Sequence, residues 1–281
     1  MTQLIKIGQI SYINCLIFNY PFDLLLSGNK KLETEISSYE EIQKAQLKLE
    51  TVKDVPSSLN QLLREGKLEI APISSFEYLR SKNQNPENNY QLVENASISS
   101  LGKVHSVIFF SNEEIETLTE INLSHESASS VALLKILLAE KYGLNLKQIK
   151  FNTFTNSGSG LTNKLLIGDK ALSQIQNHKF KYALDLGQEW FEFSNGLAMV
   201  FGLWTHRLGS EAALISKFLH ELKDYAIKNL LEDIIIEAYR KTGISKKVLY
   251  AYFNELNFDF EDKHEAGLKL YEEHLLKHEL I

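Results

Sequence analysis

The sequence predicts an α/β fold, and three observations lead to this prediction. Short apolar runs typical of strands alternate with amphipathic helical patterns through about the first 200 residues. From residue 210 to residue 281 the pattern is almost wholly helical, with breaks near Gly243 and at 257–259. The composition, with 44% hydrophobic and 23% charged residues over 281 positions, is typical of a globular chain with one or two domains. Together these features favour helices layered around a largely parallel sheet component.

The elements follow from local patterns. A first strand is expected at 4–10, where apolar and polar residues alternate. Pro56 opens a helix that ends at Gly66, and a serine-rich cap precedes an amphipathic helix over 125–143. The charged segment 31–54 lacks a clear period, so a strand, a helix and an insertion all stay open. Further strands are predicted at 68–71, 104–111, 149–154 and 164–172, and a loop is predicted at 81–90. The segment 197–207 completes the middle region of the chain, before the helical C-terminal part.

Charge and cysteine content exclude several classes of protein. The net charge of −6 and the pI of about 5.8 argue against a nucleic-acid partner. The single cysteine, Cys15, permits no internal disulfide and no cysteine-rich metal cluster. The N-terminus lacks the pattern of a signal peptide, and no stretch approaches the roughly 20 apolar residues of a membrane-spanning helix. We therefore expect a cytoplasmic protein without a membrane partner.

Polar residues gather where predicted strands end or helices begin. In α/β folds ligands bind beyond the carboxyl ends of strands, and helix N-termini attract anions. The pattern therefore indicates a small anionic ligand, although any single serine is better explained as a helix cap or a turn residue. The clusters are Ser11 and Asn14, Ser74 and Ser75, Ser99 and Ser100, Ser127, Ser129 and Ser130, and Gly168 and Asp169.

The cysteine and several histidines and aspartates of the chain also have non-catalytic interpretations. Cys15 has no histidine near it in the sequence, so a small buried residue is favoured over a nucleophile. His274 and His278 have the spacing of a helical metal pair, but the sequence shows no third ligand, and we expect no metal site. For Asp169 and Asp185, a role as a general base and a role as a helix cap both stay open. For His105, contact with an anion and a place at the edge of a strand both stay open. Phosphate-binding loops, dinucleotide fingerprints and serine-hydrolase elbows are absent from the sequence.

Six segments, taken in order, resemble the chorismate dehydratase family of the futalosine route to menaquinone. The resemblance spans about residues 5–207 and is most specific in "SYIN" and "LLIGDKAL". The related 1,4-dihydroxy-6-naphthoate synthase begins with a Ser-Pro-Cys-Pro-Asn-Asp type signature that this chain lacks. The segments are "IGQISYINCLIF", "PSSLNQLLREGKLEIAPISSFEY", "SISSLGKVHSVIFFS", "SSVALLKILL", "LLIGDKAL" and "LDLGQEW".

The chain also departs from the family pattern. Residues 15–18 read Cys-Leu-Ile-Phe where the family often has Thr-Lys-Pro-Leu. Ala128 stands in the serine-rich cap where the family commonly has Arg or Lys, so any cation needed against a substrate carboxylate must come from elsewhere. Residues 38–54 and 81–90 look like insertions.

The resemblance implies a two-lobed, type II periplasmic-binding-protein-like fold with two crossing strands, near 103–106 and 202–206, and a helical C-terminal region. Lobe one would comprise 1–103 plus 206–281, lobe two would comprise 104–205, and the ligand would lie in the cleft between them. The oligomeric state is left open between a monomer and a homodimer.

The resemblance further implies conversion of chorismate to 3-[(1-carboxyvinyl)oxy]benzoate and water. Aromatisation drives this reaction, so no cofactor is required. Asn14 is expected nearest the reacting ring, and the catalytic set is Asn14, Ser99 and Ser100. Substrate binding is assigned to Ser11, Ser75, Ser127, Ser129, Ser130, Gly168 and Asp169, with the two carboxylates of the substrate held by Ser99 and Ser100 on one side and Ser127, Ser129 and Ser130 on the other.

The base that removes the C3 proton is left unassigned, and the enolpyruvyl carboxylate of the substrate is one hypothesis. Tyr12 is expected to pack under the site. Two other functions stay open: a non-catalytic two-lobed protein that binds a small carboxylate, and the naphthoate synthase.

Overall fold

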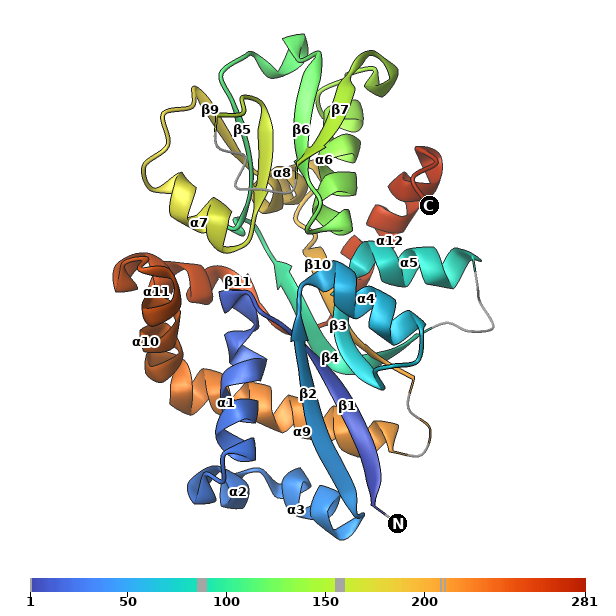
Figure 1. Ribbon diagram of the computed structural model, residues 1–281. Coiled ribbons are helices and arrows are strands. Elements are labelled where there is room, and N and C mark those ends of the chain that lie inside the picture. The colour runs from blue at the N-terminus through green and yellow to red at the C-terminus, as the bar shows by residue number, and fades with distance from the viewer. Residues whose placement is uncertain (1, 85–89, 155–159, 208, 210) are drawn as a thin grey trace.

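The computed structural model describes residues 2–84, 90–154, 160–207, 209 and 211–281, and it contains two separate sheets (Figure 1). The larger sheet has the strand order β11-β4-β10-β3-β1-β2. Its core strands are rich in Ile, Val and Leu, as expected for strands covered on both faces. The strands are β1 (Gln3–Ile10), β2 (Leu47–Asp54), β3 (Ile70–Ser74), β4 (Gln91–Ser100), β10 (Met199–His206) and β11 (Leu256–Asn257).

The smaller sheet is formed by the middle of the chain and has the order β7-β6-β8-β5-β9. Both sheets are mixed, so the expectation of a largely parallel sheet was wrong. Strand β10 runs antiparallel to β3 and β4, and β5 runs antiparallel to β8 and β9. The chain leaves the large sheet along β4 and returns along β10, which makes these neighbours antiparallel. The strands are β5 (Val107–Ser111), β6 (Glu120–Ser124), β7 (Lys150–Phe154), β8 (Lys164–Ile167) and β9 (Tyr182–Asp185).

Two short segments join the sheets, one after β4 and one before β10 (Figure 1). Strand β10 lies wholly inside the large sheet, where Gly202 pairs with Ser74 and Val200 with Ser99. We propose that the two lobes follow the two sheets, which assigns 199–205 to the first lobe instead of the second.

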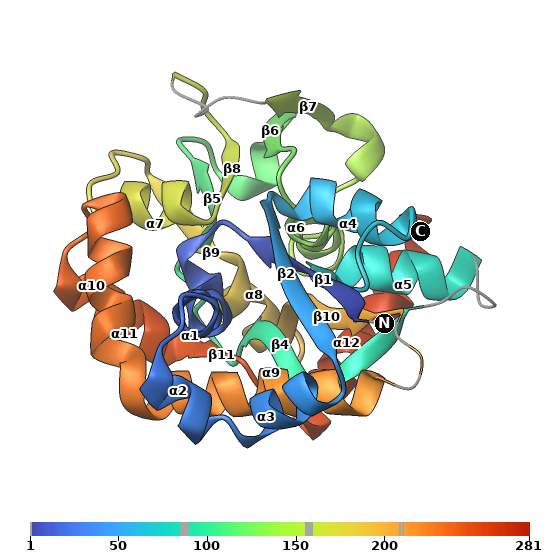
Figure 2. The ribbon, with the colours of Figure 1, turned by 60° about the horizontal axis from the view of Figure 1, so that its bottom comes forward.

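Helices cover both sheets. In the first lobe they are α1 (Leu16–Leu26), α2 (Lys30–Glu35), α3 (Ser37–Lys44), α4 (Pro56–Arg64) and α5 (Ser75–Gln84). In the second lobe they are α6 (Ala128–Glu140), α7 (Asp169–Ile175) and α8 (Leu186–Phe193). The C-terminal helices are α9 (Ala212–Tyr225), α10 (Leu231–Thr242), α11 (Lys246–Glu255) and α12 (Asp262–Lys277). Figure 2 shows α9, α10 and α11 wrapped around the first lobe.

The segment 31–54, which the sequence left open, contains most of α2, all of α3 and the edge strand β2. Residues 81–84 of the predicted loop at 81–90 belong to α5, which continues to Gln84, and residues 85–89 lie outside the described part of the chain. The breaks predicted near Gly243 and at 257–259 are confirmed.

Helix α12 packs tightly on the second junction. A Cβ atom built on Gly267 would lie 2.0 Å from the carbonyl oxygen of Ala198, so only glycine permits this approach. The indole N–H of the fully buried Trp190 donates to the same carbonyl at 3.1 Å. The junction is therefore fixed from the α8 side and from the α12 side.

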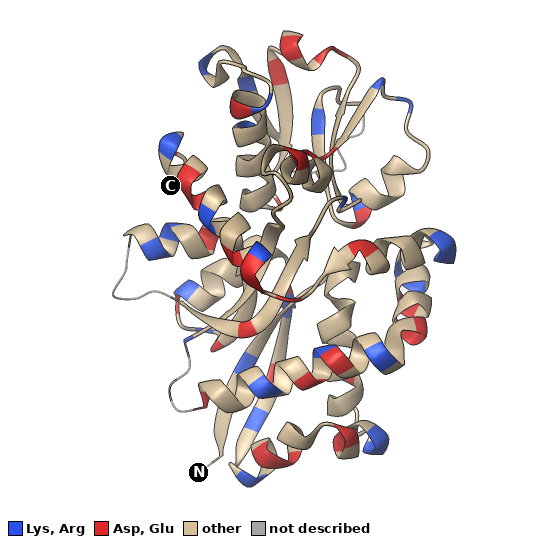
Figure 3. Ribbon diagram, turned by 180° about the vertical axis from the view of Figure 1, so that it is seen from behind, with Lys and Arg blue, Asp and Glu red and all other residues tan. Residues whose placement is uncertain are grey.

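Acidic and basic residues are interspersed along the helices seen from behind (Figure 3). Among the described helices, none has both the length and the apolar character needed to span a bilayer.

Candidate active site

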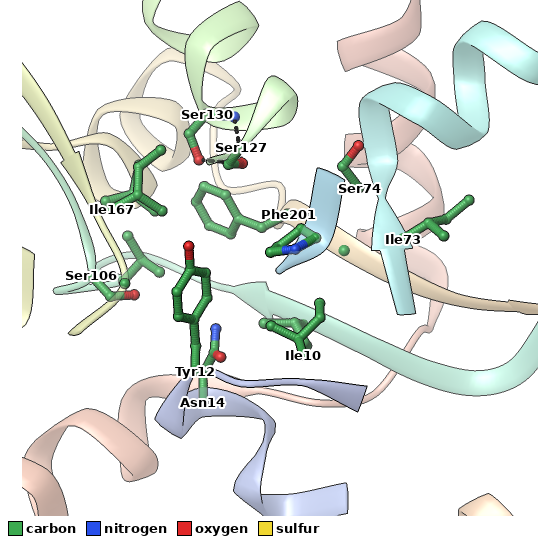
Figure 4. A pocket seen from close by; sticks show the side chains of 16 residues that line it. Ile10, Tyr12, Asn14, Ile73, Ser74, Ser106, Ser127, Ser130, Ile167 and Phe201 are labelled. Atoms are coloured by element: carbon green, nitrogen blue, oxygen red, sulfur yellow. Dashed lines mark hydrogen bonds between the residues drawn. The ribbon is translucent and has the colours of Figure 1, made fainter. Parts of the chain in front are cut away.

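A cavity lies between the two sheets. It is lined from the large sheet and the elements around it, from the small sheet and its helices, and from the first junction (Figure 4). The lining residues are Ile10, Tyr12, Asn14, Pro56, Ile73, Ser74, Ile98, Val104, Ser106, Val107, Ser127, Ser130, Ile167, Gly168, Phe201 and Gly202.

Asn14 reaches the cavity because the chain turns sharply after β1. A single 3-10 turn, Ile13–Cys15, joins the strand to α1, and the Asn19 amide braces the turn by donating to the Ile10 carbonyl at 2.8 Å. The Asn14 amide oxygen lies 3.3 Å from the Cys15 sulfur. Within the described residues its amide nitrogen has no hydrogen-bond partner, so this donor is available to a ligand.

Tyr12 stands beside Asn14, and its hydroxyl points toward Ser127 and Ser130 (Figure 4). This hydroxyl is buried and makes no well-formed hydrogen bond in the described structure. Burial, followed by the nearby Glu126 carboxylate, raises the pKa of Tyr12 well above its usual value, so the phenol keeps its proton. Tyr12 therefore presents a protonated hydroxyl to the cavity, a role beyond the packing expected from the sequence.

Ser127 and Ser130 face Asn14 from the N-terminus of α6. Ser127 is the helix N-cap: its Oγ accepts from the Ser130 backbone N–H at 3.3 Å and lies 3.0 Å from the Ser130 hydroxyl. The dipole of this 13-residue helix favours negative charge at the same place. The two hydroxyls together form a neutral donor site for an anionic group.

Gly168 completes the lining on the side of the second lobe. Its backbone, at φ 64° and ψ −143°, lies in a region open almost only to glycine, and a Cβ there would lie 3.4 Å from the Tyr12 ring. The neighbouring Asp169 carboxylate accepts from the Ile13 N–H at 3.2 Å. Burial raises the pKa of Asp169, and this hydrogen bond partly offsets the rise. These contacts join the first loop of one lobe to α7 of the other.

Ser129 and Ser75 form a second contact between the lobes, outside the cavity lining. The Ser129 hydroxyl lies 3.0 Å from that of Ser75, accepts from the Phe76 N–H and donates to the Phe201 carbonyl. All its hydrogen-bonding capacity is used in holding α6 against α5 and β10. The structure thus turns Ser129 away from its neighbours Ser127 and Ser130.

Ser99, Ser100 and Ser11 are not brought to the cavity. Ser99 and Ser100 belong to β4 itself, and not to a loop before the next strand as the sequence suggested. Ser99 donates to the Asn257 carbonyl, and Ser100 packs against Gly187, whose ideal Cβ would lie 2.6 Å from the Ser100 hydroxyl oxygen. Ser11 is exposed, and its N–H donates to the Asp54 carbonyl.

Two further lining serines were not selected as site residues. Ser74 caps α5 by accepting from the Glu77 N–H at 3.1 Å, and Ser106 accepts from the Tyr252 hydroxyl at 3.1 Å. Ser74 stands beside Ser75 in a cluster that the sequence identified, but only the strand register decides which of the two faces the cavity.

Asp185 fixes the first junction. Its carboxylate accepts the backbone N–H groups of Val104 and His105, as well as those of Gly187 and Gln188 at the start of α8. Burial raises the pKa of Asp185, with these hydrogen bonds opposing the rise. The cap interpretation of Asp185 is therefore correct.

His105 and Cys15 contact other parts of the protein and do not line the described cavity. The His105 imidazole lies 2.7 Å from the Glu255 carboxylate of α11. Cys15 is fully buried, as expected for a small structural residue, and burial raises the pKa of its thiol.

The described lining contains no Lys, Arg, His, Asp or Glu side chain. An anionic ligand would meet hydroxyls, an amide and helix N–H groups. Ala128 stands where the resembling family commonly has Arg or Lys, and no other charged side chain takes that place in the described lining.

A family model described as menaquinone biosynthesis matches residues 5–277. The chorismate dehydratase of Thermus thermophilus is 29% identical over 238 residues, which cover 79% of this chain and 84% of that protein.

Among solved structures, protein AF1704 from Archaeoglobus fulgidus matches with a TM-score of 0.74 at 17% identity, over 99% of this chain and 98% of that one. The periplasmic aliphatic sulphonate binding protein SsuA of Escherichia coli matches with a TM-score of 0.61 at 12% identity, over 100% and 94%. The CA3427 product of Candida albicans, described as having the generic periplasmic binding protein fold, gives 0.58 at 13% identity, over 98% and 94%. These likenesses confirm the predicted periplasmic-binding-protein-like fold.

Proposed function

Because the chain belongs to the menaquinone biosynthesis family, we propose that it is a chorismate dehydratase. The relative from Thermus thermophilus that carries this name supports the proposal. The structural observation that carries it is the convergence of Asn14 with Ser127 and Ser130 on one cavity between the lobes. Chorismate would bind there and leave as 3-[(1-carboxyvinyl)oxy]benzoate and water.

The lining combines hydroxyl and amide donors with apolar side chains, as a small dicarboxylate would need. We propose that one carboxylate binds to the Ser127 and Ser130 hydroxyls at the start of α6, where the helix dipole adds to the hydrogen bonds. The apolar side chains of Ile10, Ile73 and Phe201 would contact the faces of the ring. Uncharged donors suffice because a water-poor site strengthens each hydrogen bond to an anion.

The reaction breaks the C3–H and C4–O bonds and forms an aromatic ring. The chemical difficulty is kinetic, since hydroxide is a poor leaving group. The free amide N–H of Asn14 would hydrogen-bond the departing oxygen, and the Tyr12 phenol, which makes no well-formed hydrogen bond in the described structure, would offer a second donor. The contacts of Asp169 with Ile13 and of Ser129 with Ser75 would keep the lobes closed and exclude water while the bonds change.

The described lining offers no carboxylate or imidazole as a base. We therefore propose that the enolpyruvyl carboxylate of the substrate removes the C3 proton. An analogue in which this carboxylate is an amide would bind without turning over. Turnover of that analogue at the normal rate would contradict this assignment without affecting the proposed overall reaction.

The direct test incubates the purified chain with chorismate and separates the products by HPLC. We expect stoichiometric formation of the benzoate. Saturable binding of chorismate without product would favour a binding protein. Product from a cyclic futalosine-derived substrate, in place of chorismate, would identify the naphthoate synthase.

A further inference from the structure

The end of α6 lies against two histidines at the end of the chain, far from the cavity. Glu140 is the last residue of α6, His274 is in the last turn of α12, and His278 follows that helix. One possible ligand atom from each residue can be chosen so that all three lie within 4.8 Å of one another. The histidine pair is visible in the sequence, but its carboxylate partner comes from a distant helix, which is why the sequence shows no third ligand.

The three side chains are partly buried and pre-positioned. The Glu140 Oε1 atom lies 2.5 Å from His278 Nε2 and 4.0 Å from His274 Nδ1. His274 Nδ1 is buried and has no hydrogen-bond partner among the described residues. The Phe193 ring packs on the His274 ring with centroids 5.2 Å apart, which limits its rotation. An unused nitrogen lone pair is thus held close to the Glu140 carboxylate.

We propose that Glu140, His274 and His278 bind a divalent transition-metal ion, with zinc as the best match. Two imidazole nitrogens and one carboxylate oxygen form a ligand set typical of zinc, and water would take the fourth position. Zinc–ligand bonds of about 2.0–2.2 Å place tetrahedral ligand atoms roughly 3.3 Å apart, which small side-chain rotations would achieve here.

Lys277 is the group that competes with a metal ion. Its ammonium lies 2.7 Å from Glu140 Oε1. The Lys277 side chain is 60% exposed, so it can turn into solvent when an ion replaces it. The ion pair itself is worth little at such a surface, so its loss does not prevent binding.

The position of the site gives it a structural consequence. Helix α6 begins at the cavity, with Ser130 in its first turn, and ends at Glu140. Near its start the Tyr271 hydroxyl of α12 donates to the Ser129 carbonyl at 2.9 Å. A metal ion would join the same two helices at the opposite end (Figure 1) and hold α6 at both ends.

The test uses the full chain after removal of metals with a chelator. Isothermal titration with zinc chloride should give one ion per chain, and Co²⁺ should produce the intense visible absorption of a four-coordinate site. His274→Ala, His278→Ala and Glu140→Gln should each weaken zinc binding at least tenfold. His220→Ala is the matched control, because His220 is a surface histidine that pairs only with Asp224 among the described carboxylates.

Circular dichroism verifies that each variant is folded, and His274→Gln replaces any alanine variant that is not. The proposal is overturned if the wild-type chain binds no stoichiometric zinc. It is equally overturned if zinc affinity is the same in the wild-type chain and in the histidine variants. Neither result depends on turnover of chorismate, so this test is independent of the proposed activity.

Discussion

The Tyr12 ring lies directly against the backbone of Gly168, so the first loop of one lobe packs on the helix start of the other. This contact orients a phenol that has no other well-formed polar interaction in the described structure. Figure 4 shows the Asn14 amide beside the base of the Tyr12 side chain, and the Tyr12 hydroxyl at the far end of the ring, pointing toward Ser127 and Ser130.

Gly168→Ala should disturb this contact. The backbone there costs a residue with a side chain about 1–3 kcal/mol, and because the added methyl would touch the Tyr12 ring at 3.4 Å, any relaxation of the strained backbone would move this ring. We expect a lower melting temperature and a KM for chorismate raised severalfold. Gly243→Ala is the control: its φ is also positive, but a Cβ there meets no atom within 4 Å, so stability should fall while KM stays constant.

Asn14→Ala should preserve the fold and lower kcat by about 10²–10³, the range measured when one donor to a developing anion is removed. The amide nitrogen makes no hydrogen bond that the folded chain would lose. Steady-state kinetics by HPLC measures the effect, with Asn229→Ala on the exposed face of the C-terminal region as control. Activity within threefold of wild type would show that Asn14 does not face the reacting atoms.

Ser127→Ala and Ser130→Ala should separate capping from binding. Ser127 is the N-cap, so its loss should cost about 1 kcal/mol of stability as well as substrate affinity. Ser130→Ala leaves the cap bond to its own N–H in place, so only KM should rise. Melting curves and KM values measured on both variants test this difference. Equal KM values in Ser130→Ala and wild type would remove Ser130 from the binding site.

The pH dependence of stability should reflect His264. This residue is fully buried at the third position of α12, and its Nδ1 accepts the Glu261 N–H at 3.1 Å in a capping box. Burial lowers the pKa of His264 below its usual value. The unfolded chain therefore takes up a proton first as the pH falls below about 6.5, and the folded state loses stability from that point downward.

His264→Gln should make the melting temperature less sensitive to pH between about 7 and 5, because glutamine can occupy the same capping position without titrating. The control is His220→Gln, since His220 is exposed. An unchanged slope in His264→Gln would show that other groups dominate acid sensitivity.

Much of the fold could be predicted where local signals are strong. Helix α6 has a serine cap and a long apolar run, and α4 opens at Pro56, so both were identified with nearly correct ends. The expectation that α6 is amphipathic was wrong, because the helix is buried around most of its circumference. Strand β4 was missed because its second half is rich in serine. The hydroxyls of Ser97 and Ser99 donate to the carbonyls of Asp259 and Asn257, more than 150 residues away, and no local pattern carries that information.

The site was predicted only in part, because its remaining contacts also depend on the tertiary structure. Asn14, Ser127, Ser130 and Gly168 were all named from the sequence and line the cavity. Adjacent serines could not be distinguished, because register and helix phase decide which hydroxyl faces inward. Ser129, for example, is separated from Ser130 by one helical step of rotation and contacts a different lobe.

The strand order has a consequence for biosynthesis. Strand β10 occupies the centre of the large sheet, between β3 and β4, yet it is made after the whole small sheet. A nascent chain that has reached residue 198 contains every strand of the small sheet. Its large sheet still lacks β10, so the edges of β3 and β4 that pair with β10 have no partner. Such edges invite aggregation, so the ribosome-bound intermediate should depend on chaperones until residues 199–206 emerge and fill the gap.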